Sequence, residues 1–257
     1  MNTAEKLIAL KTLFMREVWR FIRLWTQTIV PPLITQSLYL MIFGTLLGKS
    51  LPNVSGVPYL EFLIPGMIIM AIINSVFINV SMSLFYMKFI RCFEELIVSG
   101  MPGWTIWAGF SLGATLRGLI IGTLVLGISM FFYPITIANI GLLLSVALLT
   151  CLLLSSGGFL SGLLSRNWDD SVIVPTFVLT PLTYVGGVFY SIDKLPDFWK
   201  IVSLFNPIYY LVDTFRASFI GYSEQPIETA ISILVLLNII AAFACLFCLK
   251  KGYGYKS

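Results

Sequence analysis

Residues 60–85, with the sequence LEFLIPGMIIMAIINSVFINVSMSLF, decide the fold class of this chain. The single charged side chain in this stretch is that of Glu61, close to its start. A helix rises about 1.5 Å per residue, so about 20 apolar residues cross the hydrocarbon core of a bilayer. The stretch therefore predicts a transmembrane helix.

The same pattern recurs along the chain and predicts six spans. The predicted spans are residues 25–48, 60–85, 104–132, 139–164, 171–192 and 227–249. They follow one another closely, which predicts a single transmembrane domain over residues 1–257 without a soluble module. The predicted fold class is an all-α membrane protein with six transmembrane helices.

The composition supports a lipid environment and excludes several kinds of chemistry. Of the 257 residues, 58% are hydrophobic and 11% are charged, and the mean hydropathy is +0.94. Soluble domains carry about 25% charged residues. The chain has no histidine, which excludes Ser-His-Asp and Cys-His catalysis and histidine metal sites within it. Cys245 and Cys248 form an isolated CxxC in an apolar run, which we interpret as helix packing and not as a metal site. We expect no catalytic residue, no metal ligand and no enzyme activity in this chain.

Lysine and arginine in the short connections predict the orientation. With the N-terminus inside, eleven basic residues lie on the cytoplasmic side and four on the other. The four outer residues are Lys49, Lys194, Lys200 and Arg216. The positive-inside rule therefore predicts that both termini are cytoplasmic.

Residues 1–24 predict a basic amphipathic helix before the first span. Leu10, Phe14 and Phe21 follow one helical face, and Arg16 and Arg20 follow the other. Such a helix lies in the inner interface with its arginines near anionic headgroups. A mechanical role and a plain juxtamembrane anchor remain equally open.

The connection after the second span, residues 86–103, predicts a short cytoplasmic helix. Glu94 and Glu95 precede a short apolar run, and Ser99-Gly100-Met101-Pro102-Gly103 then breaks the helix. This helix could dock into a groove of a cytoplasmic partner. The alternative is an interfacial helix that bridges two spans.

The connection of residues 193–226 is long and rich in aromatic side chains. Pro196 and Pro207 interrupt it, and Tyr209 and Tyr210 follow. We predict short re-entrant helices that dip into the outer leaflet and act either as an outer gate or as a structural lid.

Polar side chains at helical spacing mark three of the spans. Groups of this kind avoid lipid and face either a transport pathway or another helix. The pathway candidates are Thr28, Thr35, Gln36, Ser75, Asn79, Ser83, Thr176, Thr180 and Thr183.

Small residues and one arginine distinguish the third and fourth predicted spans. The pairs Gly109/Gly113, Gly118/Gly122 and Gly158/Gly162 permit close helix packing. Arg117 lies either deep in the membrane or close to the cytoplasmic interface. In the second case the third span begins near Gly118, and residues 104–116 form a tilted inner-leaflet segment. We favour the second alternative because about 20 apolar residues can still follow it.

Three motifs together resemble the membrane-spanning subunit of type-2 ABC exporters, the bacterial drug, polysaccharide and lipid export permeases. Residues 91–99 (RCFEELIVS) resemble the loop between spans two and three of that family, although Gly100 replaces the usual proline and Pro102 follows two residues later. Residues 186–196 (GGVFYSIDKLP) are similar to the end of its fifth span. Residues 205–216 (FNPIYYLVDTFR) are similar to its Asn-Pro segment.

The resemblance implies a homodimeric pore in the bacterial inner membrane. Each copy would pair with a separate ABC ATP-binding subunit, which would hold ATP and Mg, so this chain itself has no cofactor and no nucleic-acid partner. The cargo would be an amphipathic, lipid-linked or glycan substrate. The implied ATPase-coupling residues are Arg91, Glu94, Glu95 and Leu96. The implied outer-lid residues are Pro196, Asn206, Pro207, Tyr209, Asp213 and Arg216.

Two alternatives to an ATP-driven permease stay open. An ion-coupled secondary transporter requires carboxylates near the membrane midplane. Glu61 and Glu228 lie only at the ends of predicted spans, which disfavours it. A non-transporting membrane assembly factor is the second alternative.

Overall fold

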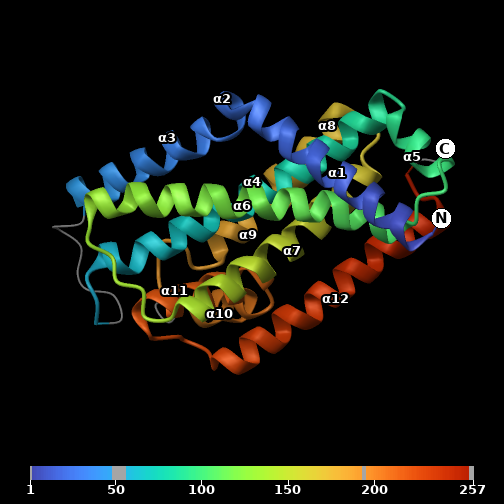
Figure 1. The fold of residues 1–257 in the computed structure, drawn as a ribbon. Helices are drawn as coiled ribbons and strands as arrows, with labels where there is room; N and C mark the ends of the chain where they lie inside the picture. The colour runs from blue at the N-terminus through green and yellow to red at the C-terminus, as the bar shows by residue number, and fades with distance from the viewer. Residues whose placement is uncertain (1, 48–55, 193–194, 255–257) are drawn as a thin grey trace.

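The computed structural model describes residues 2–47, 56–192 and 195–254, which form helices joined by turns (Figure 1). Outside the described residues lie position 48 at the end of the first predicted span and positions 193–194 of the predicted lid. Lys49, Lys194 and Lys256 of the charge count also lie outside them.

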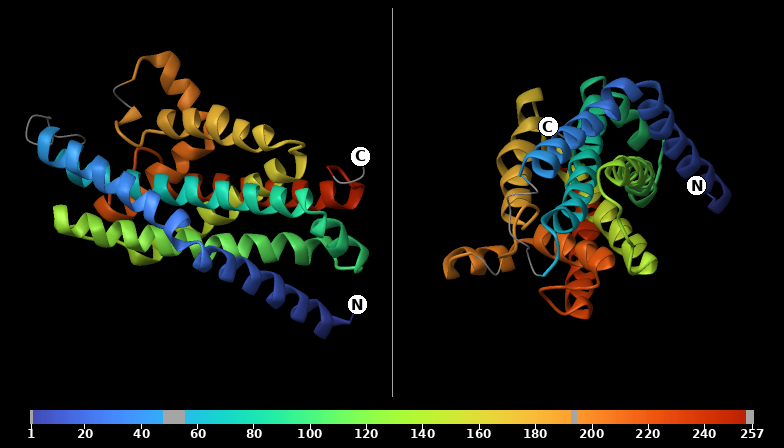
Figure 2. Two further views of the ribbon diagram at one scale, coloured as in Figure 1. Left: turned by 90° about the horizontal axis from the view of Figure 1, so that it is seen from above. Right: turned by 90° about the vertical axis from the view of Figure 1, so that its left-hand side faces the viewer.

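Within the described residues, four helices are long and apolar enough to cross a membrane: α4 (Tyr59–Phe89), α6 (Gly103–Phe132), α7 (Ile140–Leu164) and α12 (Ile227–Lys251). They coincide with the second, third, fourth and sixth predicted spans, and they confirm the all-helical prediction. Figures 1 and 2 show the axes of these helices lying roughly along the length of the molecule.

The first and fifth predicted spans are helical but interrupted. The first contains α2 (Trp25–Thr28), α3 (Val30–Tyr39) and a π-helical segment η1 (Leu40–Leu47). The fifth overlaps the end of α8 (Trp168–Ile173) and contains a π-helical segment η2 (Val174–Leu179) and α9 (Thr180–Val185). Proline lies in the first turn of α3, η2 and α9. Proline lacks an amide hydrogen and clashes with the carbonyl four residues earlier, which weakens an α-helix at that point and favours these interruptions. Pro65, by contrast, lies inside the unbroken helix α4.

The remaining helices lie at the two ends of the molecule. α1 (Thr3–Arg23) is N-terminal, and α5 (Cys92–Val98) connects α4 to α6. α10 (Asp197–Leu204) and α11 (Pro207–Ile220) lie between the fifth predicted span and α12. Figure 1 shows α5 beside both chain termini at one end, with α10 and α11 toward the other.

α4 is the centre of the packing. From Phe62 to Phe77, every residue except Asn74 is buried. A Cβ atom at Gly158 would lie 2.5 Å from the carbonyl oxygen of Phe77, and one at Gly162 would lie 2.5 Å from that of Ser81. Because lipid supplies no hydrophobic drive between helices, this close backbone approach of α7 to α4 provides van der Waals contact instead.

The Gly109/Gly113 pair lets the N-terminal helix α1 pack closely against α6. A Cβ atom at Gly109 would lie 2.8 Å from Cβ of Leu13, and one at Gly113 would lie 2.6 Å from Cβ of Glu17. Leu13, Glu17 and Phe21 are the buried residues of α1. The helix therefore lies directly against α6 and leaves large apolar side chains exposed on its outer faces, among them Leu7, Ile8, Met15, Trp19 and Ile22.

Candidate functional site

A buried polar cluster joins α1, α4 and α6. We define the polar cluster as Glu17, Arg20, Asn79, Ser83 and Arg117. The Glu17 side chain is 1% exposed, and its carboxylate lies 2.6 Å from Arg16 Nη2 and 2.9 Å from Arg20 Nη2. Ser83 Oγ donates to both carboxylate oxygens at 2.9 Å. Glu17 therefore binds α1 to the end of α4 through a charged hydrogen-bond network.

The Asn79 side chain accepts hydrogen bonds from two arginines that lie on different helices. Its Oδ1 accepts from Arg20 Nη2 at 2.6 Å and from Arg117 Nη1 at 2.6 Å. Arg117 Nη2 also donates to the backbone carbonyl of Thr28 at 3.1 Å. α6 runs without interruption from Gly103 to Phe132, so Arg117 lies midway along one helix and residues 104–116 are part of that same helix.

The electrostatics keep Glu17 ionised. Burial by itself raises the pKa of Glu17. The guanidinium groups of Arg20 and Arg16 lower this pKa by more than burial raises it, so the pKa of Glu17 lies below its ordinary value. A charged carboxylate surrounded by arginines and a serine hydroxyl stabilises the docking of α1 and is a poor proton carrier.

The sequence analysis missed Glu17. It assigned Asn79 and Ser83 to a polar stripe but named no partner for them. The available signal was the row Leu13, Glu17 and Phe21, where one carboxylate interrupts an apolar i, i+4 line. An acidic residue in such a row requires a polar partner on the helix that covers it.

α5 presents its acidic residues outward. Phe93 is 0% exposed and anchors the helix, whereas Glu94 and Glu95 are exposed. Arg91 adopts a left-handed conformation (φ 61°) where α4 ends and the chain turns into α5. Leu96 is partly buried against the core. Of the predicted coupling residues, Arg91, Glu94 and Glu95 thus face solvent, whereas Leu96 packs toward the bundle.

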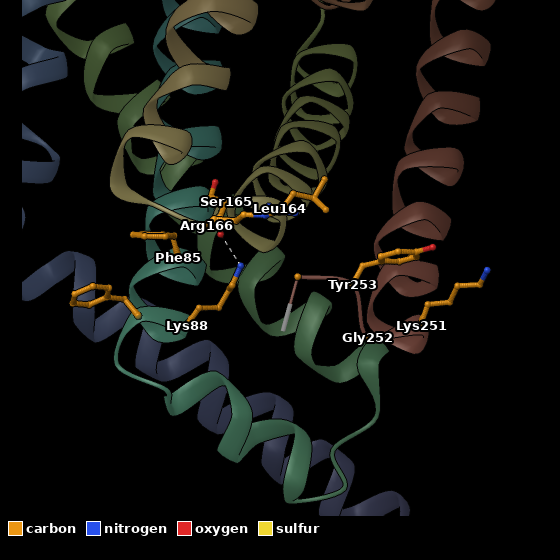
Figure 3. Close-up of a pocket in the computed structure, with 10 residues that line it drawn as sticks. Phe85, Lys88, Leu164, Ser165, Arg166, Lys251, Gly252 and Tyr253 are labelled. Carbon is orange, nitrogen blue, oxygen red and sulfur yellow. Dashed lines mark hydrogen bonds between the residues drawn. The ribbon is translucent and has the colours of Figure 1, made fainter. Parts of the chain in front are cut away.

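A cavity of about 640 Å³ lies at the same end of the molecule (Figure 3). Lys88 lines it from the last turn of α4, Arg166 from the connection between α7 and α8, and Lys251 from the end of α12. Lys88 Nζ donates to the backbone carbonyl of Ser165 at 2.8 Å and to that of Leu163, which satisfies carbonyls at the end of α7. Basic residues that are far apart in sequence therefore gather at the end that holds α5 and both termini.

α11 is buried and tied to three other segments. Asn206 caps it by accepting from the amide of Ile208 at 3.0 Å, and its Nδ2 donates to the carbonyl of Leu182 at 2.6 Å. Asp213 accepts from the amides of Glu224 and Gln225 at 3.1 and 3.2 Å.

Arg216 completes this attachment of α11. It donates to the carbonyl oxygens of Phe62 at 3.2 Å and Gly187 at 2.7 Å, and its guanidinium lies 3.6 Å from the centre of the Phe62 ring. Tyr209 Oη donates to Glu224 at 3.4 Å. Pro207 opens α11, and Pro196 is exposed before α10. Apart from Pro196, the predicted lid residues hold α11 in place.

The other pathway candidates have different surroundings. Thr183 is buried and donates to the carbonyl of Leu179, and Thr180 donates to that of Pro175. Thr28 Oγ1 donates to the carbonyl of Phe21. Within the described residues, Ser75 Oγ and Gln36 Oε1 are buried without a hydrogen-bond partner. Thr35 and Thr176 are exposed.

The long apolar helices define a multi-pass α-helical membrane protein, and comparison with known proteins places it further. Residues 8–220 match the ABC-2 type transporter family. The chain is 42% identical to the inner membrane transport permease YadH of Escherichia coli (strain K12) over 250 residues, which cover 97% of this chain and 98% of that relative.

More distant relatives are named Nodulation protein J. The protein from Rhizobium leguminosarum bv. viciae is 28% identical over 193 residues, which cover 74% of this chain and 73% of the relative. The one from Sinorhizobium fredii is 23% identical over 216 residues, which cover 84% and 82%. The chain belongs to the ABC-2 type transporter family and is a transport permease.

Proposed function

We propose that this chain is the membrane-spanning subunit of an ATP-driven exporter in the bacterial inner membrane. Two copies form the pore, and each pairs with a separate ABC ATP-binding subunit that holds ATP and Mg. The cargo is an amphipathic, lipid-linked or glycan substrate, taken from the cytoplasm or the inner leaflet. The E. coli relative, named as an inner membrane transport permease, supports the location.

The surface of α5 carries this proposal. Phe93 fixes the helix to the bundle, and Glu94 and Glu95 remain free to meet a partner outside it. The same end of the molecule holds both termini and the basic cavity (Figures 1 and 3). Because basic residues favour the cytoplasmic side, this end is the cytoplasmic one, where ATP is available.

The interrupted segments supply the fifth and sixth crossings of the membrane. α3 with η1, and η2 with α9, expose large apolar side chains, including Ile34 (55%), Met41 (56%) and Phe177 (73%). In a single copy these side chains contact lipid, whereas in a dimer they meet the second copy. We place the dimer seam and the transport route along these two segments.

The polar cluster bears on the rival ion-coupled mechanism. Glu17 is a buried carboxylate, which such a carrier would need. Burial alone would raise the pKa of Glu17, but Arg20 and Arg16 lower it overall. A carboxylate that carries protons near neutral pH needs a raised pKa. ATP-driven transport is therefore the better-supported mechanism.

The test is co-purification of the full chain with its ATPase, followed by ATP turnover measured in lipid nanodiscs. We expect the Glu94→Ala/Glu95→Ala double variant to lower bound ATPase or its coupled turnover at least tenfold. Glu228→Ala is the matched control, because Glu228 is exposed at the start of α12, at the opposite end. Unchanged assembly and turnover in the double variant would remove α5 from the coupling role.

A further inference from the structure

A second pocket lies between α1 and the last turns of α4. Its volume is about 600 Å³, and we call it the arginine pocket. Three arginines line it from α1, and apolar, aromatic and hydroxyl side chains complete it. The arginines are Arg16, Arg20 and Arg23, and Ser83, Tyr86 and Met87 line the pocket from α4.

The pocket has an excess of positive charge. Arg16 and Arg20 share one carboxylate, that of Glu17, and both of its oxygens are occupied by these arginines and by Ser83. Arg23 has no ion-pair partner among the residues that the structure describes. Each guanidinium carries five N–H donors, so several donors remain available in the pocket. A phosphate group matches this set of donors in charge and geometry.

The rest of the pocket suits the apolar part of an amphiphile. Met87, Ile90 and Leu24 supply apolar surface beside the arginines. On the same helix, Trp19 and Ile22 are 65% and 46% exposed, so the pocket adjoins a face that contacts lipid. Tyr86 and Trp19 have the amphipathic rings that favour the headgroup region.

The cavity of Figure 3 makes a useful contrast. There Lys88 is already bound by backbone carbonyls at the end of α7. Those carbonyl oxygens carry partial negative charge and repel an anion. The arginine pocket differs because its three cations are guanidinium groups, which bind a phosphate through paired N–H donors.

We propose that the arginine pocket binds the phosphate headgroup of an anionic phospholipid from the inner leaflet, with an acyl chain lying along the exposed face of α1. This rests on the proposed function, which places the end of the molecule that holds both termini on the cytoplasmic side. The bound lipid would fill the space between α1 and α4 and secure the interfacial helix against the bundle.

The test is native mass spectrometry of the purified full chain, titrated with dioleoylphosphatidylglycerol and, separately, with dioleoylphosphatidylethanolamine. We expect the phosphatidylglycerol to bind more tightly. Arg23→Gln should weaken its binding about fivefold, and Arg16→Gln/Arg23→Gln should weaken it about 25-fold. Lys11→Gln is the matched control, because it removes one exposed charge from α1 outside the pocket.

Three results would overturn the proposal. These are equal binding of the two lipids, equal weakening by Lys11→Gln and Arg23→Gln, and displacement of the lipid by millimolar inorganic phosphate, which would make this a free-phosphate site. Hydrogen exchange of α1 shows whether each variant keeps the helix docked. The measurement needs no ATPase, so its outcome is independent of whether the coupling role of α5 holds.

Discussion

Glu17→Gln tests whether the polar cluster docks the N-terminal helix. The substitution keeps the shape of the side chain but removes the carboxylate that Arg20 and Ser83 contact at 2.9 Å. Removing one partner of a fully buried ion pair costs about 3–5 kcal/mol. Arg16 and Arg20 are 38% and 28% exposed, so water compensates part of the loss and we expect about 2–3 kcal/mol here.

The assay is hydrogen exchange of the α1 amides in the purified permease. Local opening of a docked helix sets the exchange rate, so a loss of 2–3 kcal/mol corresponds to roughly 30- to 150-fold lower protection over residues 13–21. Glu5→Gln is the control. Because Glu5 belongs to the capping box at the start of the helix, its effect should stay in the first turn.

A double-variant cycle identifies the partner. If Glu17 acts through Arg20, the Glu17→Gln/Arg20→Gln pair costs at least about 1 kcal/mol less than the sum of the single variants, because the second change no longer leaves a charge unpaired. Unchanged protection in Glu17→Gln, or strict additivity in the cycle, would refute the reasoning.

Three further predictions concern the acid response of Glu17, the close approach at Gly158 and the hydrogen bonds of Arg216. The arginines hold the pKa of Glu17 below its ordinary value of 4.5 despite burial. The contribution of Glu17 to docking is therefore complete above pH 4.5 and is lost as the pH falls through the lower folded pKa. Protection of α1 should drop on acidification below pH 4.5, and Glu17→Gln should lack this step. Gly158→Ala places a methyl group 2.5 Å from a backbone carbonyl oxygen of α4 and should lower the free energy of unfolding by about 1–3 kcal/mol, whereas Gly127→Ala, with nothing within 4 Å, should be neutral or stabilising in the same thermal unfolding series. Arg216→Gln leaves two buried carbonyls without their donor and should lower the free energy of unfolding by about 2–4 kcal/mol; an unchanged thermal midpoint would contradict this.

The long spans were predictable because their signal is local. Residues 60–85 lie within α4, and residues 227–249 lie within α12, since a run of apolar residues in lipid satisfies its backbone only as a helix. The interruptions of the first and fifth predicted spans were not predicted as such. Proline residues mark them, but proline within a membrane helix can produce a kink as readily as a break, and the surrounding packing decides which.

The sequence likewise predicted one part of the candidate site and not another. The outward position of Glu94 and Glu95 follows from a short amphipathic helix with one buried aromatic residue, Phe93, and the sequence pattern indicated that helix. The sequence pattern did not predict the hydrogen-bond partners of Asn79 and Ser83. A polar stripe shows that a helix face avoids lipid, but it does not say whether a pathway or another helix covers that face.

The sequence by itself determined an all-helical membrane protein, because composition and local periodicity encode that property. The permease family was recognised from the motifs of residues 91–99, 186–196 and 205–216, and the family match confirmed it. Only the tertiary structure decided that Glu17 reaches Ser83, that Asn79 receives both Arg20 and Arg117, and that Gly113 admits α1 against α6. These contacts join residues far apart in the chain. Their pairing depends on how whole helices pack, and no local pattern specifies that packing.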